Sequence, residues 1–364
     1  MKGSRSFGRF EVLEQAGSGA AGTIYRAHDP ATGERVAVKV LRGLEDVDAA
    51  RFVREARVLA RIRHPGAVRY VDHGRDAGGH AYLVMEWLDG EDLRERLARA
   101  GLSMNESIAL GRRVAEALAV VHAHGLVHRD IKPGNLFLPG GRVEDAKIID
   151  FGLARGERAS TTVTQTGLVV GTPSYMAPEQ ARGRREIDAR ADSFSLGAVL
   201  FKCLTGRAPF EGRSIMAVLT KVLLDDAPRL REVRPDVPEE LDALVAHMLA
   251  KDPDWRPGSA QEVAQALASL GPLGAAGDEV EPAPPSGMVS GLTQGEQRVT
   301  AMLLVGAGND EGAAPPVSGM RGPDVDDAAE ARLAAIAEEH GAKLDRLVDG
   351  TRVVTLVGGG LPTD

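Results

Sequence analysis

Residues 128–135 read H-R-D-I-K-P-G-N and constrain this chain more than any other stretch. They follow a helix-like segment and precede an apolar run, so we expect a loop between a helix and a strand. Asp130 and Asn135 lie five positions apart on this loop, with Lys132 between them. Phosphoryl transfer requires such a set: a carboxylate for the attacking hydroxyl, an amide oxygen for a metal and a cation near the moving phosphate.

A second acidic motif, Asp150-Phe151-Gly152, begins fifteen residues after Asn135. It follows the mostly apolar residues 146–149, and an aspartate in this place is suited to hold Mg²⁺. With both motifs in this order, the sequence resembles a protein kinase, most closely the bacterial (Hanks-type) serine/threonine kinases. The resemblance covers residues 10–270. It implies an α+β, bilobal fold, with a small β-rich N-lobe to about residue 88 and a larger helical C-lobe beyond it.

A glycine-rich segment, G-S-G-A-A-G at residues 17–22, occurs early in the chain. Glycines allow a backbone to lie close over phosphates. A dinucleotide-binding fold would require a helix directly afterwards. Residues 24–27 and 36–41 read instead as strands around a turn. The sequence therefore predicts a β-hairpin lid over a nucleotide.

Alternation in the second of these strands places Ala37 and Lys39 on one face. A lone strand lysine is more often on a solvated edge, but the glycine segment favours a phosphate-binding role. The resemblance implies that Lys39 pairs with the α- and β-phosphates, and that Ala37 and Ile24 cover the adenine. It also implies an ion pair between Lys39 and Glu55, on a helix expected over residues 49–62.

The rest of the nucleotide site also follows from the resemblance. Met85 is expected as gatekeeper beside the adenine, with the backbones of Glu86 and Leu88 bonding to it and Phe137 forming the floor. Asp92 either reaches the ribose or is an N-terminal helix acid favoured by the dipole. The expected ATP-binding residues are Ala16, Gly17, Ser18, Gly19, Ala20, Ala21, Gly22, Thr23, Ile24, Ala37, Lys39, Met85, Glu86, Leu88, Asp92 and Phe137.

The resemblance assigns a role to each polar residue of the catalytic loop. Asp130 would orient the substrate hydroxyl and accept its proton, and Lys132 would stabilise the γ-phosphate. A lysine at this place is typical of the Ser/Thr rather than the Tyr kinases. Asn135 and Asp150 are the expected Mg²⁺ ligands, because a hard cation takes oxygen donors. ATP and Mg²⁺ are thus the expected cofactors, and the expected catalytic residues are Asp130, Lys132, Lys39 and Glu55.

Residues 150–179 match a kinase activation segment that ends in A-P-E. Its middle, residues 160–166, is rich in hydroxyls and could equally be an ordinary polar loop. In the family, the arginine that precedes the catalytic aspartate, here Arg129, binds a phosphate on this loop. We therefore expect autophosphorylation at Thr164 or Thr166, through a transient homodimer.

Several further residues match structural positions of the family, and a core helix is expected over residues 107–124. The expected contacts are His128 with Phe151, His122 with the end of that helix, Asp192 with the catalytic-loop backbone, and Arg256 with Glu179.

The chain after residue 270 has a different character. Residues 271–295 read as a flexible Gly/Pro/Ala linker. The remainder, 296–364, predicts a strand (299–305), a helix (328–340) and a hairpin whose strands are 342–348 and 351–357. This order resembles the opening of a class III nucleotide cyclase domain, in degenerate and incomplete form. Val305 replaces the first metal aspartate, and Asp349 of the hairpin turn matches the second, or is simply a turn residue. Such a fragment indicates the front of a longer protein.

The charge and composition of the chain indicate which classes of binding partner it can have. Residues 274–364 carry 15 acidic and 6 basic side chains, so the net charge of −8 belongs to the tail and the kinase-like part is nearly neutral. That balance argues against nucleic-acid binding. No apolar run approaches the roughly 20 residues that span a bilayer. A single cysteine, Cys203, suits a reducing interior. We expect a cytoplasmic protein with protein substrates.

The leading interpretation is a Ser/Thr protein kinase. The alternative is a nucleotide-binding pseudokinase scaffold, which would be expected to lack a catalytic residue, whereas all are present here. A small-molecule kinase is disfavoured by the A-P-E segment and Asp192, which build a platform for protein substrates.

Overall fold

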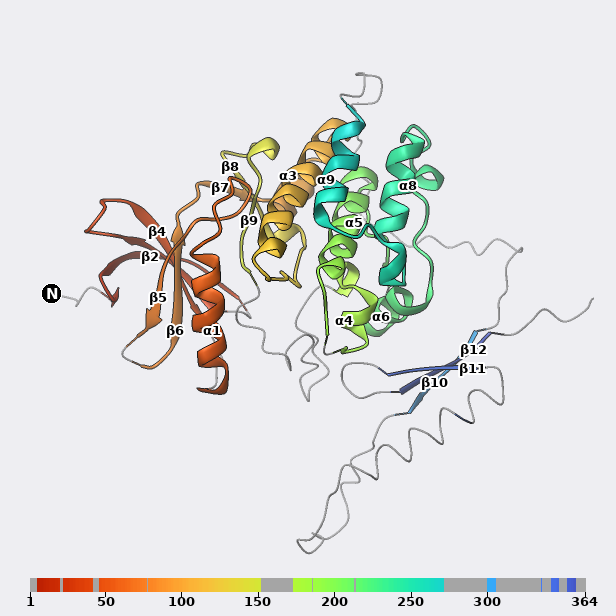
Figure 1. The fold of residues 1–364 in the computed structure, drawn as a ribbon, viewed down its shortest axis with the longest axis horizontal. Coiled ribbons are helices and arrows are strands. Elements are labelled where there is room, and N and C mark those ends of the chain that lie inside the picture. The colour runs from red at the N-terminus through yellow and green to blue at the C-terminus, as the bar shows by residue number, and fades with distance from the viewer. Residues whose placement is uncertain are drawn as a thin grey trace, which may run out of the picture.

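The N-terminal part of the chain forms an antiparallel sheet with one helix beside it (Figure 1). The computed structural model describes residues 5–19, 22–41, 46–76, 78–151, 173–184, 186–212, 214–271, 300–305, 335, 342–346 and 352–357. Six strands pair in the order β1-β2-β3-β4-β6-β5. They are β1 (Ser6–Phe7), β2 (Phe10–Gly19), β3 (Gly22–His28), β4 (Arg35–Leu41), β5 (Tyr70–Arg75) and β6 (Ala81–Glu86). Helix α1 (Asp46–Leu59) contacts β5.

The two faces of this sheet bury different side chains, because successive residues of a strand point in opposite directions. On the central strand β4, Val36 and Val38 join a small cluster with Phe7 and Tyr25. Ala37, from the alternate face, joins the main core of the molecule. Lys39 shares the face of Ala37, as the alternation predicts, and therefore points toward the C-terminal part.

The C-terminal part is a set of helices, of which α5 buries the most residues. Figure 1 shows α3, α9 and α5 side by side, and α3 packs against both of the others. The helices are α2 (Leu93–Arg99), α3 (Met104–Ala123), α4 (Pro178–Ala181), α5 (Arg190–Thr205), α6 (Ile215–Leu224), α7 (Leu230–Val233), α8 (Glu239–Met248) and α9 (Ala260–Ser269). Helix α5 is buried over most of its length, so its polar residues need partners inside the protein.

The helices predicted over residues 49–62 and 107–124 are observed at Asp46–Leu59 and Met104–Ala123, and two of these shifted boundaries have a local reason. The core helix begins at Met104 rather than 107, because Ser103 accepts a hydrogen bond from the Glu106 amide at 3.1 Å and the Glu106 carboxylate accepts one from the Ser103 amide. This capping box fixes the start. Helix α1 ends at Leu59 rather than 62, because the chain tightens into i→i+3 bonds such as Ile62 N to Leu59 O.

A small three-stranded sheet lies next to the H-R-D segment and to Asp150. Its strands are β7 (Gly90–Asp92), β8 (Leu136–Pro139) and β9 (Lys147–Ile148), in that order. The H-R-D segment lies between α3 and β8, and Asp150 follows β9. The predictions of a loop between a helix and a strand, and of an α+β bilobal fold, are confirmed.

The tail contains a separate three-stranded sheet of β10 (Thr300–Val305), β11 (Ala342–Arg346) and β12 (Arg352–Val357). The order is β10-β12-β11, and both outer strands run antiparallel to β12. The predicted hairpin is confirmed. Its turn with Asp349 and most of the expected helix 328–340 lie outside the described residues. No helix in the described ranges is long and apolar enough to span a membrane.

Candidate active site

The glycine segment lies where β2 and β3 pair, with Gly17 and Gly19 on β2 and Gly22 on β3, and the predicted strands 24–27 and 36–41 pair as parts of β3 and β4. Gly17 pairs with Ile24, and Gly19 pairs with Gly22. Gly22 has φ +147°, and a Cβ there would meet the Val40 carbonyl oxygen at 2.0 Å, so this strand contact requires glycine. Ala16, Ser18 and Thr23 lie on the same hairpin, while Ala20 and Ala21 fall outside the described residues.

The sheet register brings the expected adenine and phosphate residues onto one face. Ile24 lies directly opposite Lys39, and Ala37 lies directly opposite Met85. Paired residues of antiparallel strands share a face. One side of the sheet therefore presents an apolar patch with one ammonium group at its edge, as expected for a site that covers a base and contacts its phosphates.

Lys39 contacts Asp150 across 111 residues of sequence. Lys39 is 5% exposed. Burial would raise the pKa of the Asp150 carboxyl, but the adjacent Lys39 ammonium outweighs this, and the pKa lies below its usual value. Asp150 therefore remains ionised at neutral pH. Glu55 lies on α1, and its predicted ion pair with Lys39 stays a prediction.

The catalytic loop gathers its polar groups around Asp130. The Lys132 ammonium donates to Asp130 Oδ2 at 2.9 Å, and Asn135 Nδ2 donates to the same oxygen at 3.0 Å. Asn135 Nδ2 also donates to the Asp130 carbonyl at 2.7 Å. With its nitrogen used in this way, the amide oxygen is the atom of Asn135 that can face a cation.

The Asp150 motif lies directly beside this loop. The Ile149 amide donates to the Asn135 carbonyl at 2.9 Å, which brings the next residue, Asp150, alongside Asn135. Asp150 has φ +63°, a left-handed conformation that costs energy for a residue with a Cβ. Strained residues of this kind are concentrated at functional sites.

Asp192 on α5 binds the backbone of the catalytic loop. It is fully buried and accepts hydrogen bonds from the His128 amide at 2.8 Å and from the Arg129 amide at 2.7 Å. The predicted bracing role of Asp192 is confirmed. His122 Nε2 lies 2.8 Å from the same carboxylate. The prediction that His122 caps its own helix is therefore wrong: it completes the Asp192 site, and His124 is the C-cap residue.

His128 joins the catalytic loop to the strand before Asp150. Its ring packs against Phe151 with 5.3 Å between centroids, as predicted. Its Nδ1 accepts from the Asp130 amide at 3.2 Å, so Nε2 carries the proton toward the Ile149 carbonyl at 3.3 Å. Burial lowers the pKa of His128, which agrees with a neutral ring that uses both nitrogens.

Buried, neutral His128 should make stability depend on pH. Below the ordinary histidine pKa of about 6.5 the unfolded chain binds a proton that the folded chain does not, so the free energy of unfolding falls as pH falls. We expect wild type to lose more stability than His128→Gln between about pH 7 and pH 5, measured by urea unfolding. His64, whose pKa is also lowered by burial, contributes equally to both proteins. Equal losses would contradict this interpretation of His128.

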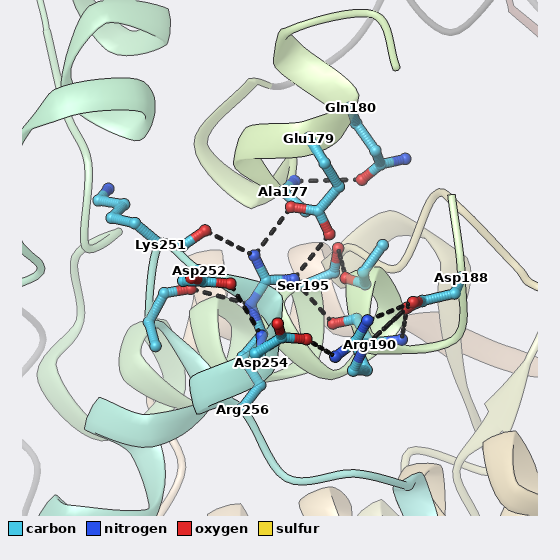
Figure 2. Close-up of polar contacts among 12 residues, drawn as sticks. Ala177, Glu179, Gln180, Asp188, Arg190, Ser195, Lys251, Asp252, Asp254 and Arg256 are labelled. Atoms are coloured by element: carbon cyan, nitrogen blue, oxygen red, sulfur yellow. Dashed lines mark hydrogen bonds and ion pairs between the residues drawn. The ribbon is translucent and has the colours of Figure 1, made fainter. Parts of the chain in front are cut away.

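The end of the activation segment is fixed by a buried ion pair. Figure 2 shows Arg256 facing Glu179, with Nη1 and Nη2 donating to the two carboxylate oxygens at 2.7 and 2.8 Å. Arg256 Nη1 also donates to the Arg190 carbonyl at 3.1 Å. The predicted pairing of Arg256 with Glu179 is confirmed, and it fixes α4 against the helical core.

The segment between the two lobes contains contacts that the sequence did not reveal. The Glu86 carboxylate accepts from the Arg69 amide at 2.8 Å and from the Lys147 ammonium at 2.6 Å, and so links the residue before β5 with strand β9. Asp92 is the N-cap of α2, accepting from the Glu95 amide at 2.9 Å, which is the helix-acid alternative. The predicted roles of Glu86, Leu88 and Phe137 toward adenine stay predictions. Thr164 and Thr166 lie outside the described residues.

A hollow of about 500 Å³ lies beside the catalytic loop. Arg129, Arg184 and Arg190 line it together with acidic residues that include Glu186 and Asp188. Arg129 Nε is buried and has no hydrogen-bond partner among the described residues.

Comparisons with known proteins agree with this geometry. Residues 10–267 match the family model of the protein kinase domain. The chain is 39% identical over 270 residues to serine/threonine-protein kinase pkn2 of Myxococcus xanthus, covering 72% of this chain and 32% of that protein. It is also 39% identical over 272 residues to serine/threonine-protein kinase PknA of Mycobacterium tuberculosis, covering 72% and 61%.

Two solved structures share the fold. The Mycobacterium tuberculosis PknI kinase domain superposes with a TM-score of 0.59 at 30% identity, covering 74% of this chain and 98% of that one. Rad53 1-466 in complex with AMP-PNP gives a TM-score of 0.59 at 27% identity, covering 71% and 64%. The chain spans about a third to three fifths of the two curated relatives above. With these matches and the contacts of its catalytic loop, the chain belongs to the protein kinase domain family.

Proposed function

We propose that this chain is a serine/threonine protein kinase that transfers the γ-phosphate of ATP to Ser or Thr hydroxyls of proteins. The arrangement around Asp130 carries the proposal: one carboxylate contacts both Lys132 and Asn135, on a loop fixed by the buried Asp192. The relatives named as serine/threonine kinases support the acceptor class. The AMP-PNP complex of the Rad53 relative supports ATP as donor.

Each catalytic residue has a role in an in-line transfer. Asp130 orients the acceptor hydroxyl and takes its proton as the new O–P bond forms, while the bond from the γ-phosphorus to the β,γ-bridging oxygen breaks and ADP leaves. Lys132, already 2.9 Å from Asp130, balances negative charge on the moving phosphoryl group. Lys39 holds the α- and β-phosphates from the sheet above.

Asn135 and Asp150 fit a Mg²⁺ ion, since both offer oxygen atoms and Asp150 is kept ionised by Lys39. When bound, the ion neutralises phosphate charge. The contribution of the protein is to hold these two oxygen donors side by side through the Ile149–Asn135 backbone bond.

The experiment that tests the proposal is incubation of the purified chain with Mg·ATP and a generic acceptor protein, with phosphosites mapped by mass spectrometry. Phosphate on Ser and Thr, and none after chelation of Mg²⁺ with EDTA, is expected. Binding of ATP without transfer would instead establish the pseudokinase alternative.

We further propose that phosphorylation at Thr164 or Thr166 activates the enzyme. Arg129 and Arg184, which line the hollow beside the catalytic loop, and the unpartnered Nε of Arg129 support a phosphate-binding role there. The Thr164→Ala/Thr166→Ala double variant should lose roughly tenfold or more in activity, because charge-assisted bonds from Arg129 are lost. Steady-state phosphorylation of the acceptor protein measures this.

The matched control is Thr161→Ala/Thr162→Ala, which removes the same number of hydroxyls from the same segment. It should retain wild-type activity. Unchanged activity of Thr164→Ala/Thr166→Ala would refute activation at these positions.

For the rest of the chain, we propose a kinase domain at 10–270, a linker at 271–295 and a degenerate cyclase-like segment at 296–364. The strand order β10-β12-β11, with both outer strands antiparallel to β12, agrees with the strands and the hairpin expected in the last of these segments. A cytoplasmic location and a transient homodimer are likewise proposed, the former on the basis of the single, buried cysteine.

A further inference from the structure

Gln180, on the short helix α4, is a polar residue without a role in the active site described above. It follows Glu179 directly, yet it is 4% exposed and belongs to a different set of contacts. Figure 2 shows its side chain turned back toward Ala177, away from the Arg256 cluster. A buried amide of this kind requires hydrogen bonds on both of its ends.

The two ends of the Gln180 amide contact two different parts of the site. Its Oε1 accepts from the Ala177 amide at 3.1 Å, at the end of the activation segment. Its Nε2 donates to the Arg129 carbonyl at 2.9 Å, on the catalytic loop 51 residues away. One side chain thus joins the segment before α4 to the residue that precedes Asp130.

The Arg129 residue that receives this bond is strained. Its φ of +64° is in the left-handed region, which is unfavourable for a residue with a Cβ. Its amide donates to Asp192 at 2.7 Å, and its carbonyl accepts from Gln180. Side chains of α5 and α4 therefore hold both sides of one strained residue, and such conformations persist only where the surroundings enforce them.

We propose that Gln180 is a positioning residue for phosphate transfer, holding the Arg129 carbonyl so that the next residue, Asp130, stays aimed at the acceptor hydroxyl. This rests on the proposed kinase activity. Because the bond also reaches Ala177, Gln180 makes the geometry of Asp130 depend on the end of the activation segment. The hydrogen bonds of the Gln180 side chain go to Ala177 and Arg129, and none joins it to the described residues of the nucleotide site, such as Lys39 and Met85.

The test uses Gln180→Met, which keeps the length of the side chain and removes both hydrogen bonds. We expect kcat to fall about tenfold while the KM for ATP stays unchanged, since a small displacement of a catalytic group affects the chemical step. We also expect faster amide hydrogen exchange at residues 128–131, a readout that does not need activity.

A second variant, Gln180→Glu, makes the same bond titratable. Above its pKa, the introduced carboxylate has no proton to donate to the Arg129 carbonyl. Once this carboxyl is protonated, its O–H can donate to the Arg129 carbonyl, while its other oxygen accepts from the Ala177 amide. Burial raises the pKa of such a carboxyl. The ratio of variant to wild-type kcat should then rise roughly threefold or more from about pH 8 to about pH 6.

The charged side chains near Gln180 can also titrate, but each of them has a hydrogen-bond partner. The pairs are Glu179 with Arg256, Asp192 with His122, and Asp130 with Lys132. Gln261→Glu, on an exposed face of α9, is the matched control and should show a flat ratio across the same range.

Each outcome decides the proposal. Wild-type kcat for Gln180→Met, or a flat pH ratio for folded Gln180→Glu, would overturn it while leaving the kinase assignment intact. A wild-type chain that transfers no phosphate would overturn the kinase assignment, and the exchange rates at residues 128–131 would then decide whether Gln180 positions the loop.

Discussion

Replacing Asp130 with Asn is expected to lower phosphate transfer by roughly 10²–10⁴-fold, the usual contribution of a positioned general base. The amide is nearly the same size as the carboxylate but cannot take the proton of the acceptor hydroxyl. Lys132 and Asn135 would keep neighbours of similar shape, so the loop should retain its conformation. Nucleotide affinity should change little, because Lys39 and the proposed adenine-binding residues lie on the sheet.

Acceptor phosphorylation and binding of a fluorescent ATP analogue, measured on the same preparations, separate the two effects. Asp145→Asn serves as control: this aspartate is 50% exposed and pairs with Arg142, away from the catalytic loop. It should leave the rate unchanged. A rate for Asp130→Asn within a few-fold of wild type would exclude the proposed general base.

Replacing Arg256 with Met is expected to destabilise the fold by about 3–5 kcal/mol, the usual effect of removing one partner from a buried ion pair. Glu179 is 5% exposed, so its charge would remain inside the protein without a counter-ion. The change would also remove donors from the carbonyls of Ala250 and Arg190. Unfolding in urea, followed by circular dichroism, measures the loss.

Arg190→Met is the matched control from the same cluster. Arg190 pairs with Asp188 and Asp254, which are 56% and 79% exposed, and exposed pairs contribute about 0–1 kcal/mol. Adding Glu179→Gln to Arg256→Met should recover part of the stability, because it removes the unpaired charge. Similar losses for Arg190→Met and Arg256→Met would mean that burial does not set the strength of the Glu179–Arg256 pair.

The catalytic core could be predicted from the sequence because its residues occur in short motifs. Asp130, Lys132 and Asn135 lie within one loop, and strand alternation alone placed Lys39 beside Ala37. Contacts between distant motifs, such as Asp192 with the Arg129 amide, were accessible only through resemblance to a family. No local pattern specifies them.

The remaining contacts depend on packing that no local pattern encodes. His122 was assigned to its own helix end, whereas its ring reaches Asp192, 70 residues further along the chain. The sequence did not predict the contacts of Gln180, because a side-chain amide can hydrogen-bond to many different groups. The helix start at Met104 was missed although Ser103 and Glu106 form a recognisable capping pattern.

The ion pair between Glu179 and Arg256 also bears on how the protein is made. Its two residues are 77 positions apart, and ribosomes add about 5–20 residues per second. About 4–15 s therefore pass between the synthesis of Glu179 and that of Arg256. Until then the charge of Glu179 favours exposure to water, so α4 should remain undocked on the nascent chain. The last segment of the activation region should thus complete its docking only when the end of the kinase domain leaves the ribosome.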